Sequence, residues 1–453
     1  MKYFLFTVAA LGVLPLSVLL FIRGRWMRYV VWAMAAAMFA WQSSSINFLS
    51  HEEYRGSARG MEVSLLYLLS FALLLTLLIR GKVRKMVPDG GFLAYVVYFL
   101  LCLPSFSTAE SAELAWCETW KMIMLYVFSI SVFWYLRTTG DVHSVLVFFA
   151  LVVLGNFLST AKAHYAGVYQ PHGIFPHRNC MGMAMNLLGP MFFAHYLMYG
   201  ARTRRGILFT LTGACAGVAC MWTYSRGAIA AMPIGYGIAA MACFLAKGSK
   251  AAVARRIVPI IAVVMLGIVA MLPRLVDRFA NASEASSNTR VELALCALEM
   301  IKDEPLRGVG INNWGIKINP PYDYAALAGR IVPENFVDGV VETVYLLVGA
   351  ECGLPALLAM VTWFIWYLVL AFRLIWKLRG TKWLFVAAGA AGGLTMNYLQ
   401  SVLEWVLRQQ MNLVCLMGVF ALLSYLGAEW RSLVAAEKKA APSGRSVPDD
   451  LDE

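Results

Sequence analysis

The residues of this chain that could do chemistry are ionisable side chains at the ends of long apolar stretches and in the segments between them. They are Arg59, Glu62, Glu118, Lys121, His164, His172, His177, Arg178, Arg226, Arg290, Glu342, Glu404 and Arg408. Ionisable residues are costly inside a membrane, so their positions are informative. A proton-coupled transporter would place Asp, Glu or Lys near the middle of its spans, where this chain has very few. The pattern predicts a site that opens at the outer ends of the spans.

Two arginines of this set lie on the side of the protein that is otherwise poor in basic residues. Arg226 belongs to TYSRGA (223–228), at a tight junction between two spans, and Arg178 belongs to PHGIFPHRN (171–179). The alternative for each is a side chain that extends to the membrane interface without further function. Because an outer arginine opposes the positive-inside distribution, we predict a functional role for Arg226 and, on a weaker form of the argument, for Arg178.

Two further patterns suggest familiar sites that we reject. His172 and His177 are five residues apart, but no other Cys or His is spaced to complete a tetrahedral zinc site. The stretch GVGINNW (308–314) contains GxG without a preceding strand or a third glycine, so it is not a dinucleotide fingerprint. A turn there could still bring Asn312 and Asn313 to a polar ligand.

The remaining candidates have simple structural interpretations. Arg290 begins an amphipathic helix, where a solvated arginine on the helix face is the ordinary case. Glu342 opens a later helical run, where the helix dipole favours a carboxylate. Glu404 and Arg408 are four residues apart, so a local ion pair is expected between them.

The composition identifies the class of protein to which these residues belong. Of the 453 residues, 60% are apolar and 14% charged, which excludes an ordinary cytosolic enzyme, a disordered protein and a small disulfide scaffold. The apolar residues form continuous stretches of helical span length, so we predict an all-α fold, a polytopic transmembrane bundle of about 12–13 helices. The candidate spans lie near residues 3–22, 29–48, 61–79, 91–107, 118–136, 143–160, 179–199, 206–223, 227–246, 257–273, 354–372, 383–402 and 411–428.

The distribution of charge predicts the orientation of the bundle. The net charge is +12, and alternate connections between spans carry most of the 38 Lys and Arg residues. Such loops mark the cytoplasmic side, so the long segment at 274–353 is predicted to lie outside and the tail inside. The odd number of spans places the N-terminus outside, although Lys2 opposes this. The positive charge is therefore an orientation signal, and we expect no nucleic acid as a partner.

The spans divide the chain into four predicted regions. These are N-terminal transmembrane helices at 1–273, the long external segment at 274–353, C-terminal transmembrane helices at 354–428 and a disordered cytoplasmic tail at 429–453.

The external segment is the one candidate for structure outside the membrane, between the tenth and eleventh spans. Its polar run at 281–290 predicts a loop, and Thr289 with Glu292 forms a capping-box pattern ahead of an amphipathic helix. The helical run that follows is expected to be interrupted at Gly353 and Pro355 before the next span begins.

Several of these segments, in this order, resemble the O-antigen ligase and polymerase superfamily of bacterial membrane glycosyltransferases. The matching pieces are GIFPHRN (173–179), YSRGA (224–228), NTRVELALCALEMIKDEPLRGVGINNW (288–314) and ETVYLLVGAECGLPALL (342–358). Together with the many spans and the long external segment, the resemblance covers most of the chain from about 60 to 428.

The resemblance implies an inverting transfer of a glycan from an undecaprenyl diphosphate carrier to an acceptor hydroxyl, on a glycan or on lipid A core. The reaction would occur at the periplasmic face of the bacterial inner membrane, among membrane lipids, without a metal or another cofactor. The family's essential arginines map onto Arg226 and Arg290, whose guanidinium groups would bind the diphosphate in place of a divalent cation. The alternatives are a polymerase that joins repeat units, a protein-glycosylating transferase, and a polysaccharide or lipid transporter.

One departure from the family concerns the base. Family members commonly have His followed by Asn where this chain has Glu342 and Thr343. Tyr345, Glu351 and Gly353 match the family pattern at their positions. A carboxylate can also take a proton from a sugar hydroxyl, so Glu342 is the predicted base. The alternatives for this base are Asp338, Glu334 and His172. The residues expected to bind the substrates are Arg178, His172, Asn312, Asn313, Tyr345, Glu404 and Arg408.

Overall fold

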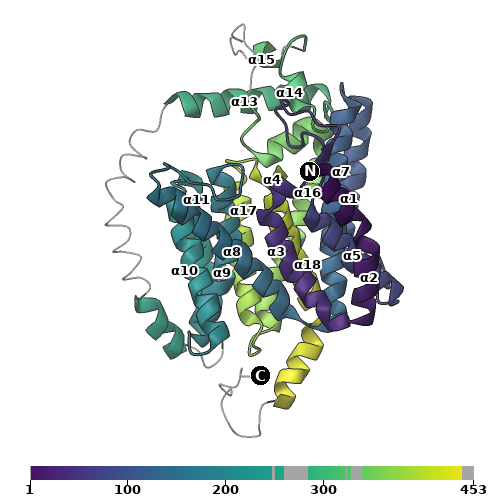
Figure 1. Ribbon diagram of the computed structural model, residues 1–453. Helices are drawn as coiled ribbons and strands as arrows, with labels where there is room; N and C mark the ends of the chain where they lie inside the picture. Colours follow the sequence, from purple (N-terminus) through teal and green to yellow (C-terminus); the bar gives the residue numbers. More distant parts are fainter. Residues whose placement is uncertain (1, 247–249, 260–283, 323, 328–338, 441–453) are drawn as a thin grey trace. The chain divides into compact units, whose positions relative to one another are not determined.

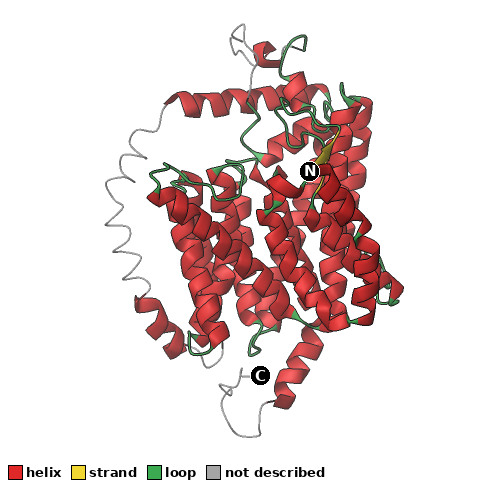
Figure 2. Cartoon of the chain, in the orientation of Figure 1, coloured by secondary structure: helices red, strands yellow, loops and turns green. Residues whose placement is uncertain are grey.

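The structure, a computed structural model, describes residues 2–246, 250–259, 284–322, 324–327 and 339–440, and most of these lie in helices (Figure 2). The one sheet among them pairs two antiparallel strands, β1 (Ile46–Phe48) and β2 (Met61–Val63). The predicted all-α class is confirmed.

The helices are labelled in chain order in Figure 1. The first are α1 (Lys2–Leu11), α2 (Val13–Ile22), η1 (Gly24–Trp26), α3 (Met27–Phe39), α4 (Trp41–Ser44), α5 (Leu65–Ile79), α6 (Gly90–Cys102), η2 (Leu103–Ser107) and α7 (Ala112–Thr139). There follow α8 (Val142–Tyr165), α9 (Arg178–Tyr199), α10 (Arg204–Trp222), α11 (Arg226–Phe244), α13 (Glu284–Asp303), α14 (Trp314–Lys317) and α15 (Tyr324–Leu327). The last are α16 (Val344–Lys377), α17 (Leu384–Gln400), η3 (Val406–Arg408) and α18 (Gln410–Ala440).

Within the described residues, seven helices are long and apolar enough to cross a membrane. They are α6 continued by η2, α7, α8, α10, α11, α16 and α18. The first two predicted spans form a pair bent by 120°, which raises the number to eight if the pair is one span. The polytopic architecture is confirmed, but among the described residues the number of such helices stays below the 12–13 spans predicted for the whole chain. α5 and α17, with 15 and 17 residues, are shorter than the spans predicted for them, and the prediction at 257–273 falls largely outside the described residues.

The chain folds as two compact units, each made of segments that are distant in the sequence. Unit 1 consists of Met1–Phe148, Ala282–Trp366 and Ser401–Ala421. Unit 2 consists of Phe149–Asn281, Tyr367–Gln400 and Leu422–Glu453. The four predicted regions follow the order of the chain, whereas the units do not, because α13 and the start of α16 belong to the same unit as the N-terminal helices.

A small core in unit 1 holds α13 against the start of α16. The face of α13 that enters it repeats at the helical spacing of three and four residues. Its four buried residues are Leu293, Cys296, Ala297 and Met300. They surround Trp314, which is fully buried and donates its indole N–H to the Gly339 carbonyl at 2.9 Å. The predicted amphipathic helix is thus confirmed.

In unit 2, α9, α11 and α17 approach one another through glycines. A β-carbon on Gly389 of α17 would lie 2.2 Å from the Cα of Met191 in α9, and one on Gly393 would lie 2.3 Å from the Leu187 carbonyl oxygen. Small residues at such contacts let helix backbones pack closely in a membrane. These close contacts fix α17 against α9 within the unit.

The start of α13 and the end of α18 differ from the sequence prediction, and the break inside α16 agrees with it. α13 begins at Glu284, so Thr289 and Glu292 lie inside the helix and the loop predicted there is wrong for the described residues. α18 continues to Ala440, so the first part of the predicted disordered tail is helical. The expected break at Gly353 is confirmed, because this residue has φ 81° and ψ 169° inside α16.

Candidate functional site

Arg290 of α13 lies between two carboxylates in unit 1. Its Nε donates to Glu342, in the segment that enters α16, and its Nη2 lies 3.7 Å from Oε1 of Glu404. The side chains of Arg290 and Glu342 are about one third exposed (35% and 37%), so this cluster opens to the surface of the unit. Two predicted catalytic residues are therefore neighbours, and Tyr345 lies in the first turn of α16, three residues after Glu342 in the chain.

A second charged cluster in unit 1 is buried. Arg408 of η3 lies 2.9 Å from Glu351 of α16 and 3.3 Å from Glu118 of α7. Lys121 lies 2.6 Å from Glu118 and donates to the backbone carbonyl of Arg408 at 2.8 Å. All four side chains are at most 4% exposed. Two acids and two bases balance, which is the condition under which buried charges are tolerated.

The charge of Arg408 is secured by its partners. Burial on its own would lower the pKa of the guanidinium group, but the carboxylates of Glu118 and Glu351 hold that pKa well above its usual value. Among the described residues, Nη1 of Arg408 has no hydrogen-bond partner. Arg408 lines a cavity of about 20 Å³ together with Tyr98 and Trp363. This volume is enough for one water molecule.

The predicted ion pair between Glu404 and Arg408 is wrong. The residues before η3 form a turn and η3 is a single 3-10 turn, so the i,i+4 spacing does not bring the two side chains together. Arg408 instead pairs with Glu118 and Glu351, and Glu404 faces Arg290. Arg408 thus holds the loop that presents Glu404, and its burial argues against direct contact with a substrate.

Asn312 and Asn313 also have a structural role rather than the predicted one. The Asn312 amide donates to the carbonyls of Ala58 and Leu114, each at 2.8 Å, and its oxygen accepts the N–H of Ser57 at 3.0 Å. The Asn313 oxygen accepts the N–H of Ser111 at 2.7 Å. Both side chains are fully buried and satisfied by protein groups, so we withdraw them from the substrate-binding set. They pin the loop before α14 to the N-terminal helices.

In unit 2, the two predicted arginines occupy the same position on two helices. Arg178 is the first residue of α9 after the cap His177, and Arg226 is the first residue of α11 after the cap Ser225. The residue before that cap, Tyr224, has a left-handed backbone with φ 49°, a conformation that non-glycine residues adopt mainly under structural constraint. This sharp turn starts α11 at Arg226.

The first turns of α9 and α11 pack directly against each other. A β-carbon on Gly182 would lie 2.7 Å from Cβ of Ala228, and the Asn186 amide donates to the Ala228 carbonyl at 2.8 Å. About two turns later in both helices, Gly189 of α9 packs against Tyr236 of α11. The contacts therefore advance in the same direction along both helices, which run parallel. Two positive helix ends and two guanidinium groups therefore gather at one end of unit 2, an arrangement that favours an anion.

The electrostatic setting of Arg226 differs from that of the arginines in unit 1. Its side chain is partly buried, and in the part of the chain that the structure describes it has no ion pair. Its charge is therefore available to a ligand. Arg178, in contrast, already interacts with other groups of the protein.

The loop before α9 holds both histidines of the rejected zinc pair. The Nδ1 atom of His172 forms a hydrogen bond with the Phe175 carbonyl oxygen, and Nδ1 of His177 accepts a hydrogen bond from the N–H of Asn179 at 3.3 Å. The pKa of His177 is lowered, mainly because burial disfavours the charged imidazolium and to a smaller extent because of the charges of Arg178 and His172. His172 shapes this loop, and a role for it as a base or in substrate binding stays a prediction.

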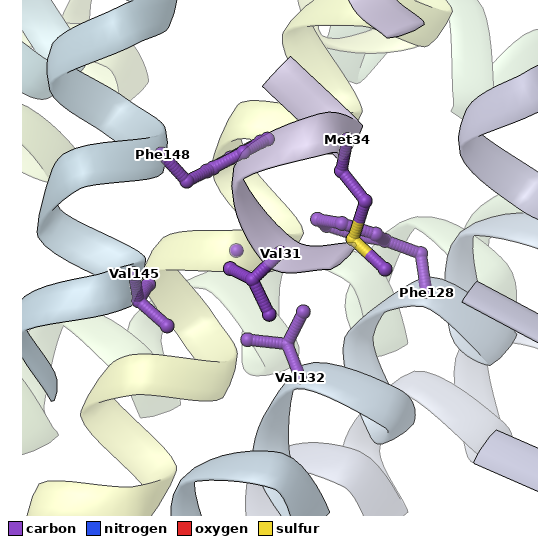
Figure 3. Close-up of a pocket in the computed structure, with 7 residues that line it drawn as sticks. Val31, Met34, Phe128, Val132, Val145 and Phe148 are labelled. Carbon is purple, nitrogen blue, oxygen red and sulfur yellow. The ribbon is translucent and has the colours of Figure 1, made fainter. Parts of the chain in front are cut away.

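A hollow in unit 1 between α3, α7 and α8 carries no polar chemistry. Figure 3 shows Val31, Met34, Phe128 and Val132 pointing into it, together with side chains from α8. Hydrocarbon and thioether groups line it, so it is a packing gap rather than a substrate site.

The buried cluster of Glu118, Lys121, Glu351 and Arg408 is not predicted from the sequence. The available signal was the spacing of three residues between Glu118 and Lys121 within an otherwise apolar span. Paired ionisable residues inside a span indicate a buried network.

The fold and these charged clusters define a polytopic helical membrane protein with polar groups gathered at helix ends. Residues 211–361, about a third of the chain, match the family described as O-Antigen ligase. Over this segment the chain is similar to the O-antigen ligase superfamily, and the similarity supports a multi-pass membrane protein with glycosyltransferase-like activity on polysaccharide and lipid-linked glycan substrates. A search of curated proteins finds no match.

Proposed function

We propose that the protein transfers a glycan from undecaprenyl diphosphate to an acceptor hydroxyl at the periplasmic face of the bacterial inner membrane. The acceptor oxygen attacks the anomeric carbon from the side opposite the diphosphate, the bond from this carbon to the diphosphate oxygen breaks, and the configuration inverts. Undecaprenyl diphosphate leaves with the electron pair, and the proton of the hydroxyl passes to a base of the protein. No metal is required, because guanidinium groups bind the leaving diphosphate.

The observation that carries this proposal is the pairing of Arg178 and Arg226 on the packed N-terminal turns of α9 and α11. A diphosphate bears several anionic oxygens, which match two guanidinium groups and the free N–H groups of two helix ends. The absence of an ion pair at Arg226 within the described residues supports a charge kept for a ligand. The additional assignment of Arg290 to the diphosphate stays a prediction from the sequence.

For the base, the ion pair with Arg290 supports Glu342. The guanidinium partner orients this carboxylate, and its partial exposure leaves it accessible to a hydroxyl. Of the predicted alternatives, Asp338 and Glu334 lie outside the described residues.

The test is transfer by the purified chain between a lipid-linked glycan donor and candidate acceptors in detergent, with EDTA present. Arg226→Ala should lower the rate about 100-fold or more, since it removes a charge that stabilises the leaving group. Arg204→Ala is the matched control, because Arg204 is also the first residue of a helix in unit 2 but lies in a basic, cytoplasmic-type loop. Loss of transfer on adding EDTA, or equal effects of the two substitutions, would contradict the metal-free model.

The acceptor separates a ligase from a polymerase. A ligase moves the completed glycan to lipid A core, whereas a polymerase extends one lipid-linked glycan with another. Gels of lipopolysaccharide from a deletion strain should show core without long chains if the protein is a ligase, and core with single repeat units if it is a polymerase.

A further inference from the structure

Gln400, the last residue of α17, is a buried amide without a partner. Its side chain is 3% exposed, and in the described part of the chain neither Nε2 nor Oε1 has a hydrogen-bond partner. Leaving such groups unpaired in the interior costs free energy, and native structures rarely do so without a reason. Asn397, one turn earlier, provides the contrast, because its amide donates to the carbonyls of Met183 and Gly393 at 3.1 and 3.0 Å.

The unpaired amide lies at the start of α11, beside Gly227, which follows Arg226 in the chain. A β-carbon added at Gly227 would lie 3.6 Å from Cγ and 3.7 Å from Nε2 of Gln400. The missing side chain at Gly227 therefore leaves room beside the carboxamide. Figure 1 shows α17 alongside α11 within this unit, and the end of α17 meets the beginning of α11.

The chemistry of the amide limits what it can bind. A phosphate oxygen can accept from Nε2, but it has no hydrogen to give to Oε1. A ligand that satisfies the whole carboxamide must both donate and accept, as a sugar hydroxyl or an acetamido group does. In a glycosyl diphosphate, the substituent on carbon 2 is the nearest such group to the phosphate, because carbon 2 adjoins the anomeric carbon.

We infer that Gln400 binds the hydroxyl or acetamido group on carbon 2 of the sugar attached to the diphosphate. Nε2 donates to the oxygen of that group, and Oε1 accepts its O–H or N–H. This inference rests on the proposed function, since it takes Arg226 as the ligand of the diphosphate. Gln400 is then a specificity-determining residue for the donor sugar.

Binding of three soluble donor analogues to the full-length chain in detergent tests this inference. The probes are farnesyl diphosphate alone and farnesyl diphosphate linked to N-acetylglucosamine or to 2-deoxyglucose. The wild type should bind the N-acetylglucosamine probe about tenfold or more tightly than the 2-deoxyglucose probe, because the latter leaves the amide unpaired. Gln400→Met should bind both sugar probes alike and farnesyl diphosphate as the wild type does.

Stability measurements separate this role from a structural one. Gln400→Met removes an unpaired amide at nearly constant volume, so its melting temperature should equal or exceed that of the wild type. Asn397→Leu removes a satisfied amide and should lower the melting temperature while keeping the preference between the sugar probes. Gly227→Ala, which fills the space beside the carboxamide, should weaken binding of the N-acetylglucosamine probe.

The outcomes distinguish this inference from the proposed function. The assignment of Gln400 is overturned if the wild type shows no preference between the two sugar probes. It is also overturned if Gln400→Met keeps the wild-type preference. Either result leaves the proposed function standing. Affinity for farnesyl diphosphate that is unchanged in Arg226→Ala overturns both.

Discussion

Three arginines of this chain have three different electrostatic settings, and the setting decides what each can do. Arg408 is buried between two carboxylates, so its charge is consumed by the fold. Arg290 is shared by Glu342 and Glu404 at a partly exposed position, where it can orient a carboxylate. Arg226 lies at the start of a helix without an ion pair in the described residues, which leaves its charge to a ligand.

Removing Arg408 should destabilise the protein strongly. Among the described residues, Arg408→Met leaves Glu118 and Glu351 buried with Lys121 as the remaining cation of the cluster, and breaking such a cluster costs about 3–5 kcal/mol. Thermal unfolding in detergent should show a large fall in melting temperature. Adding Glu351→Gln should restore part of it, because the excess negative charge is then removed. A single variant as stable as the wild type would contradict this account.

His177 should make the start of α9 sensitive to pH. Its pKa is lowered from the usual 6.5, so the unfolded form gains a proton first as the pH falls and the folded form loses relative stability below about pH 6.5. Protonation also removes Nδ1 as the acceptor that caps the helix. Hydrogen exchange of the first-turn amides of α9, corrected for intrinsic rates, should accelerate a few-fold between pH 7 and 5.5. In His177→Asn, whose cap does not titrate, the acceleration should disappear.

At the scale of elements, the contact between α9 and α11 brings two helix ends together, and Gly182 permits it. Gly182→Val would push against Ala228, 2.7 Å from the new β-carbon, and separate the two N-terminal turns. We expect at least tenfold weaker binding of farnesyl diphosphate, because both arginines shift relative to each other. Gly237→Val is the matched control, since nothing lies within 4 Å of its β-carbon. Equal affinity in the two variants would show that the contact does not shape the anion site.

Elements with strong patterns were predicted well, and those that depend on packing were not. The helical spacing of Leu293, Cys296, Ala297 and Met300 indicates the buried face of α13, and the structure confirms it. Its start was misplaced because a capping pattern also occurs inside helices, where tertiary packing extends the element. The loop around Glu404 was misjudged for a related reason. A spacing of four residues pairs side chains only on a helix, and those residues form a turn.

At the scale of the whole molecule, the distribution of basic residues predicts which ends of the helices face the cytoplasm. Alkaline phosphatase, which is active only after export, should be active when fused after Asp303 in the external segment and inactive when fused after Thr203 between α9 and α10. Fusions after Ala440 should also be inactive, because the C-terminal end of α18 is predicted to be cytoplasmic. The reverse pattern of activity would invert the topology and move Arg226 to the cytoplasmic side.

The amino-acid sequence was sufficient for the class of protein, the likeness to the O-antigen ligase superfamily and a short set of arginines and carboxylates. These depend on composition, hydropathy and local motifs, which are properties of the chain read in order. Tertiary structure decided which charges lie together, because a pair such as Arg290 with Glu342 joins residues 52 positions apart. It also showed the unpaired amide of Gln400, since satisfaction of a buried polar group depends on neighbours that only the folded chain supplies.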